Sequence, residues 1–227
     1  MAAWSIGWAR PVRANRPGFG SVRTWCLAGR LWPVPRWIMG LFERLVRAFP
    51  PPRWMDPPAV VPGQLGDVLL LAHTDVAAVA VVGLAGYPTG FEFTLRLLLH
   101  REKPFGRRVE PSMEMHRWRG HSDPPSDFPR LSVQFADGTL ISNLDRLPYD
   151  QPDVEPAKPL LVETPRGISG AQRTDLAYWV WRLPPPGPVT FTCRWPACRI
   201  DNARAHIDAS RILDAAARSI DPWPGDP

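Results

Sequence analysis

The sequence predicts an all-β fold, an antiparallel β-sandwich with short α-helices near its N- and C-terminal ends. Apolar and polar side chains alternate with a period of two in several short segments. Turn signals recur roughly every dozen residues, and strands do not alternate with helices as they do in a parallel sheet. An immunoglobulin-like architecture is compatible with this pattern, although no second cysteine lies in an earlier core strand.

Proline placement supports the same fold. The 227 residues include 29 Pro and 17 Gly, while the hydrophobic content of 44% is ordinary for a globular protein. Because proline lacks the N–H that a β-ladder needs, proline clusters indicate connections rather than strands. The segments without any proline are 65–87, 89–103, 130–147, 166–183, 189–195 and 197–221.

The positive charge is concentrated at the N-terminus. Residues 1–38 contain six arginines and no Asp, Glu or Lys. Without them, 21 basic residues face 22 acidic ones, so residues 39–227 sum to −1. We therefore expect neither nucleic acid nor membrane as a partner of the folded domain.

Composition also divides the chain. Residues 1–38 are predicted to be a disordered, Arg-rich arm without a useful strand or helix, and the abrupt shift favours a native start at Met39. Residues 39–54 are predicted to be an amphipathic helix and linker, with apolar residues spaced three and four apart from Ile38 to Phe49. The sandwich domain is predicted to span 55–222, and 223–227 form a tail.

Strands are expected at 67–71, 76–84, 91–99, 130–136, 139–143, 160–163 and 204–208. The clearest is 91–99, where Phe91, Phe93 and Leu95 point one way and Glu92 and Thr94 the other. Residues 101–129 form a long charged loop, and 167–170 a flexible stretch. Asp208 or Ser210 is expected to cap a helix whose apolar face includes Ile212, Ala216 and Ile220.

The segment from Asp175 to Trp195 is predicted to be a hairpin with a Pro-rich turn. Its first strand is apolar on both faces, which is typical of a strand that is covered on both sides. On one of these faces Trp179 and Trp181, together with Trp195 of the second strand, are candidate binding residues in an exposed aromatic platform. Core packing is the alternative use of these tryptophans.

Four motifs, YPTGFEFTL (87–95), VQFADGT (133–139), YWVWRLPPPGPVTF (178–191) and CRWPA (193–197), resemble those of a family of uncharacterised actinobacterial proteins. The similarity spans roughly residues 39–224 and supports the start at Met39. The family has no assigned activity, so the resemblance implies no site residue.

One candidate metal site lies in the long loop. His116, His121 and Asp123 carry imidazole and carboxylate ligands of the kind that bind divalent cations, but their spacing matches no established site. Cys193 and Cys198 are expected to be free thiols, which indicates a reducing, cytoplasmic location. The stretch Gly167–Gly170 is a degenerate match to a nucleophile elbow, which requires a strand, a turn and then a helix.

The sequence contains no recognisable set of catalytic residues, no cofactor is predicted, and no small-molecule binding site can be recognised. The leading hypothesis is therefore a non-enzymatic interaction or structural module that binds a protein partner or itself. Two alternatives stay open. One is an atypical metal-dependent enzyme that uses loop 101–129, and the other is a basic arm that binds nucleic acid or anionic membrane.

Overall fold

A computed structural model describes residues 24–27, 30–33, 52, 54–57, 59–100, 128–151, 153–170 and 172–224. The chain divides into two compact units, Met1–Pro50 and Pro51–Pro227. The predicted helix within residues 36–49, loop residues 101–127 and the end of the tail lie outside the described residues.

The first unit contains a short β-hairpin. Strands β1 (Thr24–Leu27) and β2 (Arg30–Pro33) pair antiparallel, with Trp25 opposite Trp32. Residues 1–38 were predicted to be a disordered arm without a strand of useful length, and these two four-residue strands lie within that segment. The scattered Arg and Pro residues of this segment obscured the two short strands in the sequence.

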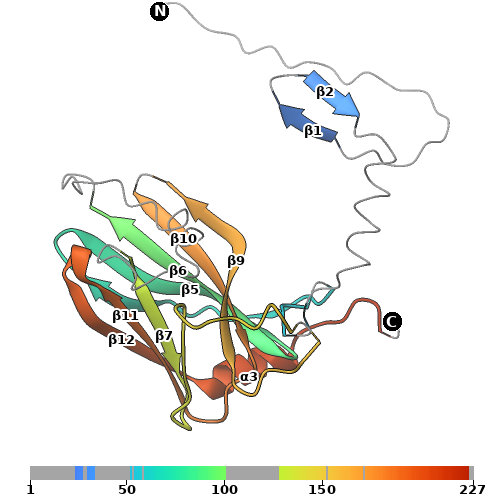
Figure 1. Cartoon of the computed structure of the whole chain (residues 1–227). Coiled ribbons are helices and arrows are strands. Elements are labelled where there is room, and N and C mark those ends of the chain that lie inside the picture. Colours follow the sequence, from blue (N-terminus) through green and yellow to red (C-terminus); the bar gives the residue numbers. More distant parts are fainter. Residues whose placement is uncertain are drawn as a thin grey trace, which may run out of the picture. The chain divides into compact units, whose positions relative to one another are not determined.

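The second unit confirms the predicted antiparallel β-sandwich, in which two sheets pack face to face (Figure 1). The six-stranded sheet has the order β3-β5-β6-β10-β9, with β4 also paired to β5, and the four-stranded sheet has the order β12-β11-β7-β8. The strands are β3 (Gly63–Gln64), β4 (Leu69–His73), β5 (Ala77–Tyr87), β6 (Gly90–Leu99), β7 (Arg130–Gln134), β8 (Leu140–Ser142), β9 (Leu160–Ser169), β10 (Arg173–Trp181), β11 (Pro188–Trp195) and β12 (Ile200–Asp208). A 3₁₀ turn, η1 (Pro196–Cys198), and the helix α3 (Ala209–Ala217) complete it.

The core between the sheets follows the predicted alternation. Phe91, Phe93 and Leu95 of β6 are buried, whereas Glu92 and Thr94 between them are partly exposed. Phe93 stacks on Tyr178 of β10 at 5.5 Å and meets Phe191 of the opposite sheet edge-on at 5.0 Å between ring centroids. Aromatic contacts therefore join the two layers at the centre of the core.

Strands β10 and β11 do not form the predicted hairpin. Strand β10 pairs with β6 and β9 in one sheet, and β11 pairs with β12 and β7 in the other. The segment between Trp181 and Pro188 contains three consecutive prolines and carries the chain from one sheet to the other. The prediction was wrong because a Pro-rich connection separates two strands without determining whether they pair.

Strand β9 extends through residues 167–169, which were expected to be flexible. The register with β10 jumps from Thr164 opposite Ala177 to Ile168 opposite Asp175. Residues 165–167 form a bulge there, and a Cβ on Gly167 would lie 2.7 Å from the Asp175 carbonyl oxygen. Pro165 and Gly167 thus signalled an irregular strand rather than a loop.

Helix α3 begins as predicted, with the side chain of Asp208 accepting a 2.8 Å hydrogen bond from the Ser210 N–H. It ends at Ala217, so Ile220 does not share its apolar face as expected. Ile220 instead exchanges two backbone hydrogen bonds with Val61, of 2.8 and 2.9 Å, which hold the chain extended beyond the helix. The helix packs against β5 and β3 through close contacts at Gly63 and Gly86.

Gly86→Ala tests this close packing. A Cβ on Gly86 would lie 2.4 Å from the Ala216 nitrogen and 2.8 Å from the Ile212 oxygen, whereas nothing lies within 4 Å of one on Gly66. Because backbone atoms cannot move aside without shifting the helix, Gly86→Ala should lower the free energy of unfolding by about 1–3 kcal/mol. Gly66→Ala is the control, and equal effects of the two in urea unfolding would contradict the close contact.

Candidate functional site

The side of the six-stranded sheet that faces away from the core carries a second apolar cluster. Trp179 and Trp181 of β10 point to this side, opposite to Tyr178 and Val180 in the main core. This outer aromatic cluster comprises Trp54, Tyr87, Leu160, Val162, Trp179 and Trp181. The prediction that β10 is covered on both faces is thus supported by the burial of its side chains.

Trp54 covers this cluster from a distant part of the chain. The Trp179 indole N–H donates a 2.9 Å hydrogen bond to the Trp54 carbonyl oxygen, and Tyr87 meets Trp179 edge-on at 5.3 Å. The Trp54 ring lies 5.3 Å from that of Tyr149, and the Arg182 guanidinium lies 4.5 Å from the Trp181 ring. The segments that contain Trp54 and Tyr149 therefore cover Trp179 and Trp181.

The predicted exposed aromatic platform is wrong. Trp179 is 0% exposed and Trp181 7% exposed, because Trp54 and the segment around Tyr149 lie on them. Trp195 is 1% exposed and belongs to the main core, since its strand is in the other sheet. The three candidate binding residues neither form one surface nor reach solvent.

An ion cluster fixes the covering segment to the sheet. The Arg166 guanidinium pairs with Asp56 of that segment and donates a 2.9 Å hydrogen bond to Glu92 of β6. Burial, together with the negative charge of Glu92, raises the pKa of Tyr87, so its hydroxyl stays protonated between these groups. Both carboxylates pair with the same guanidinium, which indicates a structural clamp rather than a reactive site.

Beyond the clamp, this side of the sheet carries exposed apolar side chains around a second ion cluster. The register aligns Leu70, Ala80, Arg96, Asp175 and Ile168 in one row across β4, β5, β6, β10 and β9. Val68 is 68% exposed, Leu70 61%, Leu98 40% and Ile168 65%. We call this surface the open face, defined by Val68, Leu70, Ala78, Ala80, Val82, Leu98 and Ile168 around Arg96 and Asp175.

Asp175 lies at the centre of the open face with two arginines. Arg96 donates two hydrogen bonds to its carboxylate, of 2.9 and 3.0 Å, and the Arg173 Nε donates a third of 3.0 Å. Burial alone would raise the pKa of Asp175, but these hydrogen bonds and positive charges outweigh it and lower the pKa from 3.8 to about 2. The carboxylate is ionised at neutral pH and fully engaged, so it does not serve as a general base.

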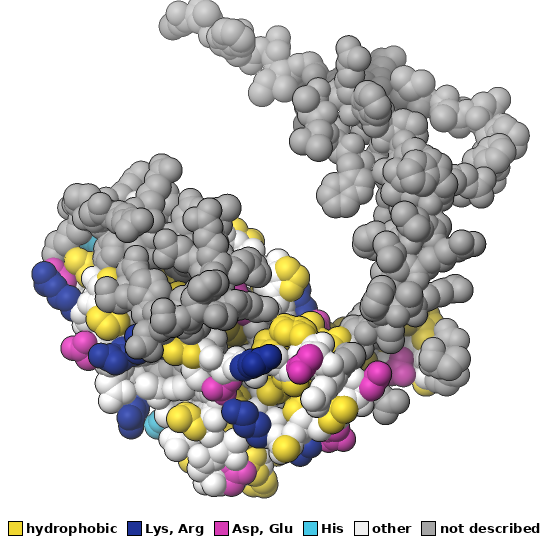
Figure 2. Space-filling view, viewed as in Figure 1, with side chains coloured by type: hydrophobic (Ala, Val, Ile, Leu, Met, Phe, Trp, Pro, Cys, Tyr) yellow, Lys and Arg dark blue, Asp and Glu magenta, His cyan; other side chains and the backbone are white. Residues whose placement is uncertain are grey.

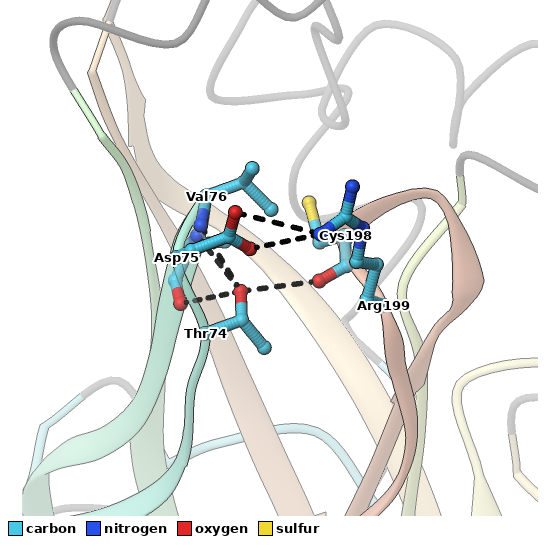
Figure 3. A network of polar contacts seen from close by, with 6 residues as sticks. Thr74, Asp75, Val76, Cys198 and Arg199 are labelled. Atoms are coloured by element: carbon cyan, nitrogen blue, oxygen red, sulfur yellow. Dashed lines mark hydrogen bonds and ion pairs between the residues drawn. The ribbon is translucent and has the colours of Figure 1, made fainter.

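A polar network joins the two sheets near the turn between β4 and β5 (Figure 3). The Thr74 hydroxyl accepts hydrogen bonds from the N–H groups of Val76 and Ala77, at 3.3 and 3.1 Å. It also lies 3.2 Å from the carbonyl oxygens of Ala77 and Cys198, to one of which it donates at a time. Arg199 approaches Asp75 at 3.3 Å.

Cys198 of this network, like Cys193, is a free thiol with no exposed surface. Burial raises the pKa of each thiol to about 12, so both stay protonated at neutral pH. A protonated thiol is neither a strong nucleophile nor a metal ligand, and the network therefore connects the sheets without supplying chemistry.

The other predicted chemistry receives no support from the described residues. His116, His121 and Asp123 lie outside them, so the metal site stays a prediction. Within the described ranges no three His, Cys, Asp or Glu side chains gather as metal ligands. Ser169 lies at the end of β9 and contacts the Thr174 hydroxyl across the hairpin at 3.4 Å, without the helix that a nucleophile elbow needs.

The described helix, α3, is nine residues long, too short to cross a bilayer.

The sequence contained a signal for the open face that pattern reading missed. Leu98 occupies a position where the alternation of β6 calls for a polar residue, and Ala78, Ala80 and Val82 repeat this on β5.

Trp54→Ala tests whether the outer aromatic cluster contributes to folding. Removing a fully buried tryptophan leaves a cavity beside Trp179 and should lower the free energy of unfolding by about 3–5 kcal/mol. Trp223→Ala is the control, because Trp223 is 63% exposed. Urea unfolding measures both, and a loss below about 1 kcal/mol for Trp54→Ala would contradict the covered cluster.

Asp175→Asn tests the ion cluster through pH. Because the pKa of Asp175 is lowered in the folded state, its stabilisation is present above the unfolded pKa of about 3.9 and is lost as pH falls through about 2. Since Arg173 is 51% exposed and screened by water, we expect Asp175→Asn to cost about 1–2 kcal/mol at pH 7. The difference from wild type should narrow between about pH 5 and pH 2. Asp201→Asn, at an exposed position, is the control, and a difference that stayed constant with pH for Asp175→Asn would contradict the assignment.

Comparison of the chain with protein-family models, curated proteins and solved structures finds no match in any of the three. The similarity of the four sequence motifs to actinobacterial proteins stays a resemblance, and the immunoglobulin-like architecture stays a prediction.

Proposed function

We propose that this chain is a non-enzymatic interaction module that associates with a second copy of itself through the open face. The single observation that carries the proposal is the exposure of Leu70, Leu98 and Ile168 around one central ion cluster. Exposed apolar side chains gathered on one side of a sheet mark interaction sites, whereas single ones scattered over a surface do not.

The charges on the open face favour a second copy over a partner of one charge. Asp175 and its two arginines place both signs within one small area. In a two-fold symmetric contact the same patch faces itself, so a surface with both signs can be complementary to its own copy. From β4 to β10 the sheet spans three strand spacings, about 14 Å, which is wide enough for apolar side chains to pack on either side of the charges.

The alternatives rest almost entirely on residues that the structure does not describe. The metal-dependent enzyme requires His116, His121 and Asp123, and the nucleic-acid or membrane binder requires the arginines of residues 1–38. No described contact favours either of them. We place the protein in the cytoplasm, and the two free thiols support this proposal because they persist in a reducing compartment.

Leu70→Asp tests self-association. A carboxylate at this position would face its counterpart or apolar side chains in the contact, whereas in the free chain it points to solvent. We expect the wild-type mass in sedimentation velocity to rise toward a dimer with concentration, and the variant to stay monomeric.

Leu140→Asp is the matched control, because Leu140 is 58% exposed on the four-stranded sheet. It should associate as the wild type does, and circular dichroism should show all three proteins folded. A wild type that stays monomeric at every concentration, or equal effects of the two substitutions, would overturn the proposal.

A further inference from the structure

The outer side of the four-stranded sheet differs chemically from the open face. Outward positions on β11, β7 and β12 hold hydroxyl, amide, imidazole and guanidinium groups instead of apolar chains. In the visible part of the described surface, dark-blue, magenta and yellow side chains are scattered among white atoms (Figure 2). We call this surface the arginine face, defined by Arg130, Ser132, Gln134, Thr190, Thr192, Arg194, Arg204 and His206.

Strand register brings the positive groups together. Arg194 lies directly opposite Arg130, and Arg204 lies opposite Thr192 in the next row. His206 follows opposite Thr190. Like charges that face each other in a sheet repel, so an anion beside Arg194 would be favoured by this arrangement.

Many arginines in the described part of the chain pair with a carboxylate, whereas Arg194 and Arg204 of this face do not. Six others, Arg96, Arg166, Arg173, Arg182, Arg199 and Arg211, each pair with a carboxylate. Arg194 is exposed and makes no ion pair with a described residue, and Arg204 donates only to the Asn202 amide oxygen, at 3.1 Å. These two guanidinium groups keep most of their donors available.

Acidic groups lie only at the two ends of this surface. Asp208 is engaged as the cap of α3, where it accepts the Ser210 N–H. Asp201, in the bulge opposite Arg194, is exposed and forms no ion pair within the described residues. The rows between them hold no carboxylate, so the local charge is positive although residues 39–227 sum to −1.

We infer that the arginine face binds an extended acidic segment of a partner protein. Guanidinium groups bind carboxylates through paired hydrogen bonds, and the Thr190 and Thr192 hydroxyls add donors between them. Successive outward rows are about 7 Å apart, which matches the spacing of alternate side chains in an extended peptide. No aromatic side chain occupies an outward position of this face, so bases have nothing to stack on, which disfavours single-stranded nucleic acid.

Fluorescence anisotropy with the full chain tests the inference. The probe is a fluorescein-labelled peptide of alternating Glu and Ser, and the same peptide with Gln in place of Glu is its control. We expect binding of the Glu peptide to weaken as salt rises. Arg194→Ala and Arg204→Ala should each weaken it several-fold, and together by about tenfold or more.

Arg146→Ala is the matched control, because Arg146 is exposed, forms no ion pair with a described residue and lies outside these strands. It also removes one positive charge, and the arm of residues 1–38 is identical in every variant. Equal weakening by Arg146→Ala and Arg194→Ala, or no binding of the Glu peptide, would overturn the inference.

Two further measurements identify the class of partner and the location of the binding site on the chain. Oligothymidine binding more tightly than the peptide, with the same sensitivity to Arg194→Ala, would overturn the choice of an acidic protein segment. Hydrogen exchange should show peptide-dependent protection in residues 130–134 and 188–208, and protection elsewhere alone would contradict the location. Leu70→Asp should leave peptide binding intact, which separates this inference from self-association.

Discussion

The rest of the structure depends on the burial of both faces of β10. Leu176, Tyr178 and Val180 face the core, so Trp179 and Trp181 must face outward, where tryptophan is costly to expose. A buried indole N–H also needs an acceptor, and the Trp54 carbonyl supplies it from 125 residues away in sequence. One contact thus satisfies an apolar and a polar requirement together, and it brings the N-terminal end of this unit across the sheet.

That contact also determines which part of the outer surface stays open. The covering segment is held to the sheet at the Arg166 clamp, where Asp56 and Glu92 both pair with one guanidinium. Beyond it, Asp175 gathers Arg96 and Arg173, and the sheet continues as exposed aliphatic side chains. The two ion clusters therefore lie on the same side of one sheet with different surroundings, one beneath a covering segment and one within an uncovered apolar surface.

The sequence predicted the positions of the strands better than which strands pair and which segments cover them. Alternation at Phe91–Leu99 and on both faces of β10 identified which side chains point together, because that periodicity is local. It did not identify what covers each face, since Trp54, Tyr149 and Trp179 meet only through the tertiary fold. For the same reason the sequence predicts a hairpin of β10 and β11 that does not form, and leaves both an exposed platform and core packing open for tryptophans that are in fact buried. Leu98, an apolar residue at a polar position, was the local signal that the outer surface has a further role.

Self-association and binding of an acidic segment can occur at the same time, because they use different outer surfaces of the sandwich. The open face lies on the six-stranded sheet and the arginine face on the four-stranded one, with the core between them. A dimer formed through the open face would leave both of its arginine faces exposed, on opposite sides of the assembly. Each arginine face alone offers a few guanidinium groups to an acidic segment, which gives modest affinity. Two linked copies raise the effective concentration of the second face once the first is bound, so self-association would strengthen binding to a partner with repeated acidic segments without adding any new contact.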